Sequence, residues 1–145
     1  MTSIQELIPV LQISIGPVIL ISGVGLLLLS MTNRLSRVIE RARTLLAVSE
    51  TVSGRVQKRV LAQIDILWVQ ARLIRLSILM ASTSLLSAAC LIIALFITAL
   101  FKLEDAWLIS ALFVTCLLSL IGSLLAFITD INRSLTAFKV ELYDR

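Results

Sequence analysis

Three long runs without a charged side chain constrain the fold of this chain more than any other feature. They cover residues 7–31, 76–101 and 106–129. About 20 consecutive apolar residues are enough for a helix to cross the hydrocarbon core of a bilayer, and each run is longer than that. The sequence therefore predicts an all-α integral membrane protein with three transmembrane helices, built as a single membrane domain over residues 1–145. A hydrophobic content of 59% agrees, because soluble domains average about 45–50%.

The segment between the first two runs, residues 32–75, is polar but keeps a helical period. Its apolar residues recur at steps of three and four, which indicates a narrow seam on each of two helices. The seams comprise Leu35, Val38, Ala42 and Leu45, then Val56, Val60, Ile64, Leu67, Ala71 and Ile74. Polar residues and Gly54 separate the two halves and indicate a turn. We expect an antiparallel helical hairpin, with Asp65 in a structural ion pair with Arg37 or Arg41.

The basic residues predict how the chain sits in the membrane. Nine of the 13 Lys and Arg residues lie in the hairpin segment, three lie in residues 130–145, and only Lys102 lies between the second and third runs. Because cytoplasmic segments carry an excess of Lys and Arg, we expect the N-terminus outside and the hairpin and C-terminal tail in the cytoplasm. The tail has apolar residues at helical steps (Ile131, Leu135, Phe138 and Leu142). This spacing predicts a short C-terminal amphipathic helix on the membrane surface or on the hairpin.

Small residues form stripes along the second and third runs. Small side chains let helices approach closely in lipid, where packing drives association. The stripes comprise Ser77, Ala81, Ser84 and Ala88, then Thr115, Ser119, Gly122 and Ala126. We expect the two spans to pack tightly against each other within one subunit; contact of one stripe with another subunit is the alternative.

The first run carries a different pattern, a line of polar residues and glycines. It comprises Gln5, Gln12, Gly16, Gly23 and Ser30, at steps of seven, four, seven and seven. Polar groups that face lipid are costly, so this line should face protein or water. It either packs on the other two spans or lines a pore or subunit interface. Pro17 lies inside the same run and is expected to kink the helix or loosen its hydrogen bonding.

The residues that carry most enzymatic and metal chemistry are missing from this sequence. The chain has no histidine, which is the commonest general base and a frequent metal ligand. The runs contain no Asp, Glu, Lys or Arg, although pumps and ion-coupled carriers place such groups at membrane depth. Cys90 and Cys116 lie within apolar runs and are interpreted as small hydrophobes. We expect no enzyme, cofactor or metal site, and no nucleic-acid binding, because the net charge of +4 is placed to meet a membrane.

Arginines cluster directly after the first run, at Arg34, Arg37, Arg41 and Arg43. One interpretation is a topology anchor that binds anionic lipid headgroups, each basic residue contributing about 1 kcal/mol. The other is a recognition face for a partner subunit or an acidic ligand. The surrounding stretch, N-R-L-S-R-V-I-E-R-A-R over residues 33–43, resembles the signature of a bacterial family of small three-span membrane proteins whose function is unknown. Asn33, Arg34, Ser36, Arg37, Glu40 and Arg41 carry the resemblance, which implies a bacterial inner membrane, or a thylakoid membrane in a cyanobacterium.

Three thin helices bury little surface alone, so we predict a homo-oligomer with a cyclic arrangement. The leading functional hypothesis is a non-enzymatic membrane protein, either a passive channel or a scaffold with a cytoplasmic helical stalk. The alternative is an accessory subunit that docks on a larger membrane complex through its basic hairpin.

Overall fold

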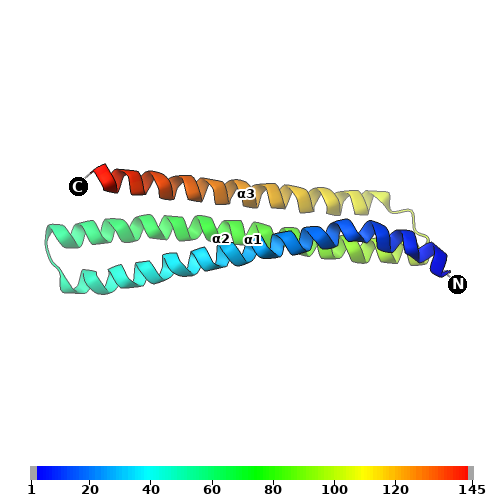
Figure 1. Ribbon diagram of the computed structural model, residues 1–145, viewed down its shortest axis with the longest axis horizontal. Helices are drawn as coiled ribbons and strands as arrows, with labels where there is room; N and C mark the ends of the chain where they lie inside the picture. Colours follow the sequence, from blue (N-terminus) through cyan, green and yellow to red (C-terminus); the bar gives the residue numbers. More distant parts are fainter. Residues whose placement is uncertain (1–2, 144–145) are drawn as a thin grey trace. The chain divides into compact units, whose positions relative to one another are not determined.

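The computed structural model describes residues 3–143, with positions 140 and 141 described in their backbone alone. Within this range the chain forms three long helices, α1 (Ile4–Thr51), α2 (Arg55–Phe101) and α3 (Ala106–Tyr143) (Figure 1). All three are long and apolar enough to cross a membrane. The predicted all-α class with three candidate spans is therefore confirmed.

Each helix continues without a break from its apolar run into its polar part. The first arm of the expected hairpin is the end of α1, the second arm is the start of α2, and the expected short C-terminal helix is the end of α3. The reason lies in the sequence, which has no Gly or Pro between Gly25 and Gly54 or after Gly122 to interrupt the backbone hydrogen bonds. Pro9 and Pro17 both lie inside α1, and the helix continues through them.

Residues 52–54 connect α1 to α2. Gly54 has a φ of 74°, a left-handed conformation that glycine adopts without steric cost. The Gln57 side chain reaches back across the turn and donates from Nε2 to the Ser49 carbonyl at 3.4 Å. Residues 102–105 make the second connection, where Lys102 is also left-handed at a φ of 52°.

The chain divides into two compact units, and all three helices contribute to both. The apolar unit consists of Met1–Leu28 and Met80–Gly122, and the basic unit consists of Leu29–Leu79 and Ser123–Arg145. Along α1, buried or half-buried positions recur in a pattern that repeats every seven residues. They include Leu7, Val10, Ser14, Pro17, Ile21, Val24, Leu28, Met31, Leu35, Val38, Ala42, Leu45 and Ser49, and Leu20, Gly25, Leu27 and Arg34 beside this seam are also half-buried. Alternating steps of three and four are the spacing of a coiled-coil seam.

Aliphatic side chains form the core of the basic unit. Val38, Leu67 and Ile74 are buried together, and partly buried hydrophobic residues pack around them. These are Leu35, Ala42, Leu45, Ala71 and Ile78. The cluster contains every residue of the first predicted seam and three of the second, so α1 and α2 pack together here. Val56, at the far end of the second seam, is exposed.

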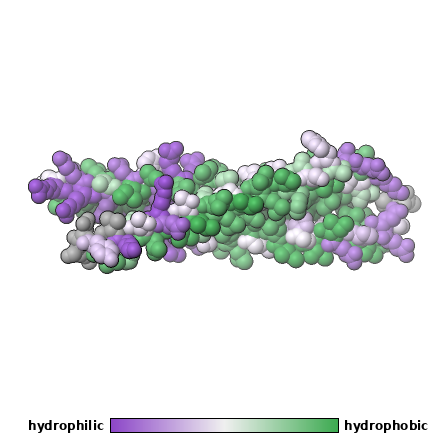
Figure 2. Space-filling view, turned by 90° about the horizontal axis from the view of Figure 1, so that it is seen from above, coloured by the Kyte–Doolittle hydropathy of each residue, from purple (hydrophilic) through white to green (hydrophobic). Residues whose placement is uncertain are grey.

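Small and weakly polar side chains form the interior of the apolar unit. Ala81, Ser84, Ala88 and Cys116 are buried. Ser84 Oγ donates to the Cys116 carbonyl at 3.0 Å, and Cys116 Sγ donates to the Ser84 carbonyl at 3.4 Å. Large side chains such as Leu86, Ile93 and Leu118 are exposed instead. Figure 2 shows such hydrophobic side chains (green) gathered over a broad part of the surface, while hydrophilic ones (purple) gather elsewhere.

Candidate functional site

An ion pair between a half-buried arginine and a fully buried aspartate joins α1 to α3 in the basic unit. Asp130 is 0% exposed, and Arg34 Nε donates to its Oδ2 at 2.6 Å. Arg34 Nη2 also donates to Ser134 Oγ at 2.7 Å, and Gln70 Nε2 of α2 donates to the same hydroxyl. Arg34, Gln70, Asp130 and Ser134 thus form one hydrogen-bonded set that links the three helices, which we call the polar cluster.

The polar cluster lies where the apolar runs end. Arg34 is the first charged residue after the first run, and Asp130 directly follows the third. The Arg34 guanidinium lies 5.9 Å from the centroid of the Phe127 ring, within the distance of a cation–π contact. Burying a charge is costly unless it is paired and hydrogen-bonded, and both conditions are met between Arg34 and Asp130. The sequence analysis missed Asp130, Gln70 and Ser134, although the position of Asp130 at the end of a run was a usable signal.

Asp65 takes no part in this pairing. Within residues 3–143 the structure gives it no ion pair with Arg37 or Arg41; the acid that pairs with the arginine segment is Asp130, which binds Arg34. Asp65 instead lines a pocket of about 340 Å³ beside Gln70, Asp130 and Arg133. Asp130 Oδ1 is buried and has no hydrogen-bond partner among the described residues.

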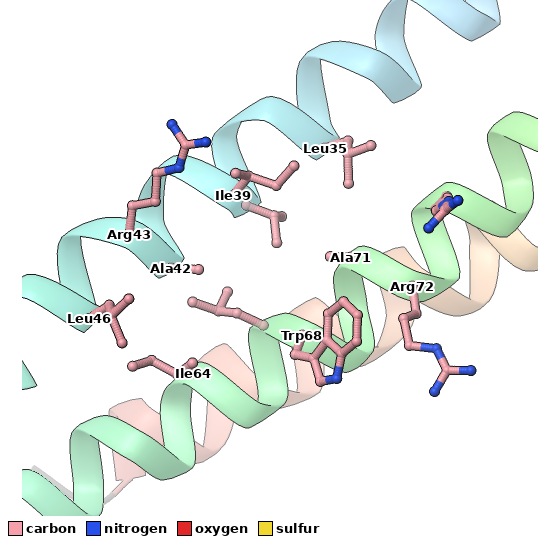
Figure 3. Close-up of a pocket in the computed structure, with 12 residues that line it drawn as sticks. Leu35, Ile39, Ala42, Arg43, Leu46, Ile64, Trp68, Ala71 and Arg72 are labelled. Atoms are coloured by element: carbon pink, nitrogen blue, oxygen red, sulfur yellow. The ribbon is translucent and has the colours of Figure 1, made fainter.

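A second feature of the basic unit is an apolar groove between α1 and α2, with a volume of about 460 Å³ (Figure 3). Its walls are Leu35, Val38, Ile39, Ala42 and Leu46 of α1 and Ile64, Leu67, Trp68 and Ala71 of α2, with Arg43, Arg72 and Arg75 at its edges. In Figure 3 the side chains of Arg43 and Arg72 extend away from the space between the helices, whereas those of Leu46, Ile64 and Ala42 face it. Arg72 lies against the Trp68 ring, 6.0 Å from its centroid.

The four predicted arginines therefore have different roles. Arg34 is held inside the basic unit by Asp130. Arg37, Arg41 and Arg43 are exposed and form no ion pair with any residue that the structure describes. These three remain available to a lipid headgroup or a partner.

The polar line of the first span faces outward. Gln5, Gln12, Gly16, Gly23 and Ser30 are all exposed. They lie outside its inward seam: Gln5 and Gln12 fall two positions from the nearest seam residue, and Gly16, Gly23 and Ser30 each fall just before one, at exposed positions. In the single chain, this line therefore does not pack on the other two spans.

The two predicted small-residue stripes differ in burial. Ser77, Ala81, Ser84 and Ala88 of α2 are all buried. On α3, Thr115 is exposed, and Ser119, Gly122 and Ala126 are half-buried. The buried residues of α3 are Cys116, Ser123 and Asp130, one position further along. Ser123 Oγ donates to the Ser77 carbonyl at 2.8 Å, so α2 and α3 approach closely in both units.

Residues with catalytic or metal-binding potential are sparse. No three His, Cys, Asp or Glu side chains gather among the described residues. Cys116 is buried, Cys90 is exposed, and both are free thiols.

Comparison with protein families matches residues 14–140 to a family described as Protein of unknown function (DUF2721). The chain belongs to the DUF2721 family. The matched residues include the polar cluster and the whole apolar groove of this DUF2721 chain. Comparisons with curated proteins and with solved structures find no match. The function must therefore be argued from the molecule itself.

Proposed function

We propose that this DUF2721 chain is a non-enzymatic, homo-oligomeric membrane scaffold that holds its basic hairpin at a cytoplasmic membrane surface. The bacterial inner membrane is the proposed location, or the thylakoid membrane in a cyanobacterium. The concentration of Lys and Arg between the first two runs and after the third supports an external N-terminus and a cytoplasmic C-terminus. The exposed Arg37, Arg41 and Arg43 are placed to contact anionic lipid headgroups.

The outward polar line of α1 is the observation that carries the proposal. Gln12 is exposed within a span, where a lipid neighbour would leave its amide without hydrogen bonds. A Cβ atom added at Gly16 or Gly23 would meet nothing within 4 Å, so both glycines expose bare backbone. Interhelical hydrogen bonds and small residues at close contacts are the features that bring transmembrane helices together. A second copy of α1 would satisfy both.

Native mass measured in nanodiscs tests this interface. The double variant Gly16→Ile/Gly23→Ile should fold normally, because a Cβ atom at either position meets nothing within 4 Å in the single chain, but should lose the oligomer. Gly25→Ile is the matched control, since Gly25 also has open space around it and lies off the polar line. A monomeric mass for the wild type would refute the proposal.

A passive channel is the more specific form of the same arrangement, with Gln12 facing a central opening. Protein reconstituted in liposomes should then give a conductance that Gln12→Leu alters. If no conductance is measured at either polarity, the channel is refuted and the scaffold proposal still stands.

The accessory-subunit hypothesis is favoured by a separate observation, the three exposed arginines without an ion pair among the described residues. Crosslinking in native membranes followed by purification should then recover one stoichiometric partner protein. Recovery of the chain alone would contradict it.

A further inference from the structure

The basic unit leaves two apolar surfaces uncovered. One is the groove between α1 and α2 (Figure 3), where Trp68 is 61% exposed and Ile39 and Leu46 are also exposed. The other is a stripe on α3 formed by Ile131, Leu135, Phe138 and Leu142, of which Leu135 is 69% and Phe138 61% exposed. Large apolar patches on surfaces outside the bilayer mark sites of interaction.

The groove and the α3 stripe have the same length. The stripe extends from Ile131 to Leu142, and the groove from Leu35 to Leu46 on α1 and from Ile64 to Arg75 on α2. Each is therefore about 16 Å long, at 1.5 Å per residue. The stripe residues follow one another at steps of four, three and four, which places them on one face of a helix.

The two surfaces also lie at the same height along the helices of the basic unit. Arg34 bonds to Asp130 and Ser134, and Gln70 bonds to Ser134. Ser123 bonds to the Ser77 carbonyl. These contacts place the stripe within about one helical turn of the groove. Copies inserted in one membrane with the same orientation share this height, so a rotation about the membrane normal can bring the stripe of one copy to the groove of the next.

We propose that the α3 stripe of one copy docks in the α1–α2 groove of its neighbour. The contact joins two different surfaces, so it is heterologous and closes into a ring when the rotation permits. This docking rests on the proposed homo-oligomer, and it would be the contact between copies on the cytoplasmic side. One interface covers both exposed surfaces, with Trp68 and Phe138 as the large anchors that such contacts favour.

The direction of the edge arginines favours a helix over a lipid as the occupant. Arg43 and Arg72 line the groove only at its edges and extend away from the space between the helices (Figure 3), so an anionic headgroup deep between α1 and α2 would meet mainly apolar side chains. Arg133 lines pockets against α2 rather than the stripe. Lys139, on the stripe's helix, is exposed and would bring a like charge near Arg43. Self-association through this contact should therefore strengthen as salt screens the repulsion, whereas binding of an anionic lipid would weaken.

Cysteine crosslinking between two co-expressed chains tests the contact. Each chain carries one new cysteine in a Cys90→Ala/Cys116→Ala background, so any mixed product joins two copies. The height-matched pairs Ile39→Cys with Leu135→Cys and Leu46→Cys with Leu142→Cys should crosslink. The mismatched pair Ile39→Cys with Leu142→Cys should not, and neither should Leu135→Cys with itself. Crosslinking of Leu135→Cys with itself would overturn the proposal, because it would show a two-fold contact between stripes.

Native mass at two salt concentrations separates this proposal from the scaffold itself. Leu135→Asp should lose the wild-type assembly, and Thr136→Asp, at an exposed position off the stripe, should keep it. Trp68→Ala should weaken self-association at least about tenfold. A monomeric wild type refutes the scaffold. Two results would overturn the docking but not the scaffold. One is an assembly that persists in Leu135→Asp while the matched cysteine pairs fail to crosslink. The other is phospholipid bound to the wild type that Trp68→Ala removes.

Discussion

The two units of this chain use the same helices to build interiors of different make-up. In the apolar unit small residues such as Ala81, Ser84, Ala88 and Cys116 are buried beside Val24 and Leu91, while large side chains such as Leu86 and Ile93 are exposed. In the basic unit the aliphatic cluster of Val38, Leu67 and Ile74 is buried, polar side chains such as Ser77 and Asp130 are buried too, and Arg37, Arg41 and Arg43 are exposed. The seam of α1 keeps one seven-residue spacing through both units. The seven-residue spacing therefore determines which positions face inward, and the surroundings of each unit determine which residue types occupy those positions.

For the proposed membrane protein, the physical cause is the difference between the two solvents that the units would meet. Water drives aliphatic side chains inward at about 25 cal/mol per Å² of apolar surface. Lipid tails are as apolar as leucine, so close packing and hydrogen bonds between helices must hold the spans together. In the sequence, Arg34 and Asp130, which form an ion pair, are the first charged residues after the first and third runs. Substitutions at three positions test this contrast between the two units, and we expect them to lower stability by different amounts.

Arg34→Leu should have the largest effect. It leaves the buried Asp130 carboxylate without its charged partner, and breaking a buried pair from one side costs about 3–5 kcal/mol. Thermal unfolding followed by circular dichroism in detergent should show a strongly lowered Tm. The double variant Arg34→Leu/Asp130→Leu should recover much of the loss, since it removes both charges. Equal stability of Arg34→Leu and the wild type would show that Asp130 is not buried as a charge.

Ile74→Ala should have the next largest effect, because Ile74 is 0% exposed in the core of the basic unit. Deleting a buried isoleucine costs about 2–5 kcal/mol. Ile93→Ala is the matched control in the apolar unit, where the same side chain is 59% exposed, and it should change the unfolding free energy little. Denaturant titration of both variants measures the difference. Equal losses would mean that the outward face of the spans is covered in the native assembly.

Sequence reasoning reached the parts of this fold that depend on local pattern. The uncharged runs predict the spans, Gly54 predicts the turn, and the Leu35 and Val38 seam predicts the pairing of α1 with α2. The predicted small residues of α3 include Thr115 and Gly122, whereas the buried ones are Cys116 and Ser123, one position further along. Small residues occupy both registers of that run, so spacing alone could not choose between them.

The polar cluster depends on information that one helix does not contain. Arg34 and Asp130 are 96 residues apart, and the height at which α1 meets α3 follows from the packing of all three helices in the basic unit. The same packing directs Asp65 toward the pocket beside Asp130 instead of toward Arg37. The outward direction of Gln12 was likewise one of two alternatives until the inward seam was known.

Ser84 offers the finest test, because it separates hydrogen bonding from close packing inside the apolar unit. Ser84→Ala removes the bond to the Cys116 carbonyl but keeps the volume small, so it should cost only about 0.6 kcal/mol, the average for such bonds between membrane helices. Ser84→Leu should cost more, about 1–3 kcal/mol, because the 1%-exposed site has no room for the larger side chain. Steric trapping or thermal unfolding in bicelles can rank the two variants. If alanine is the more harmful of the two, hydrogen bonding rather than small size holds these spans together, and the contrast with the basic unit is one of polarity instead of packing.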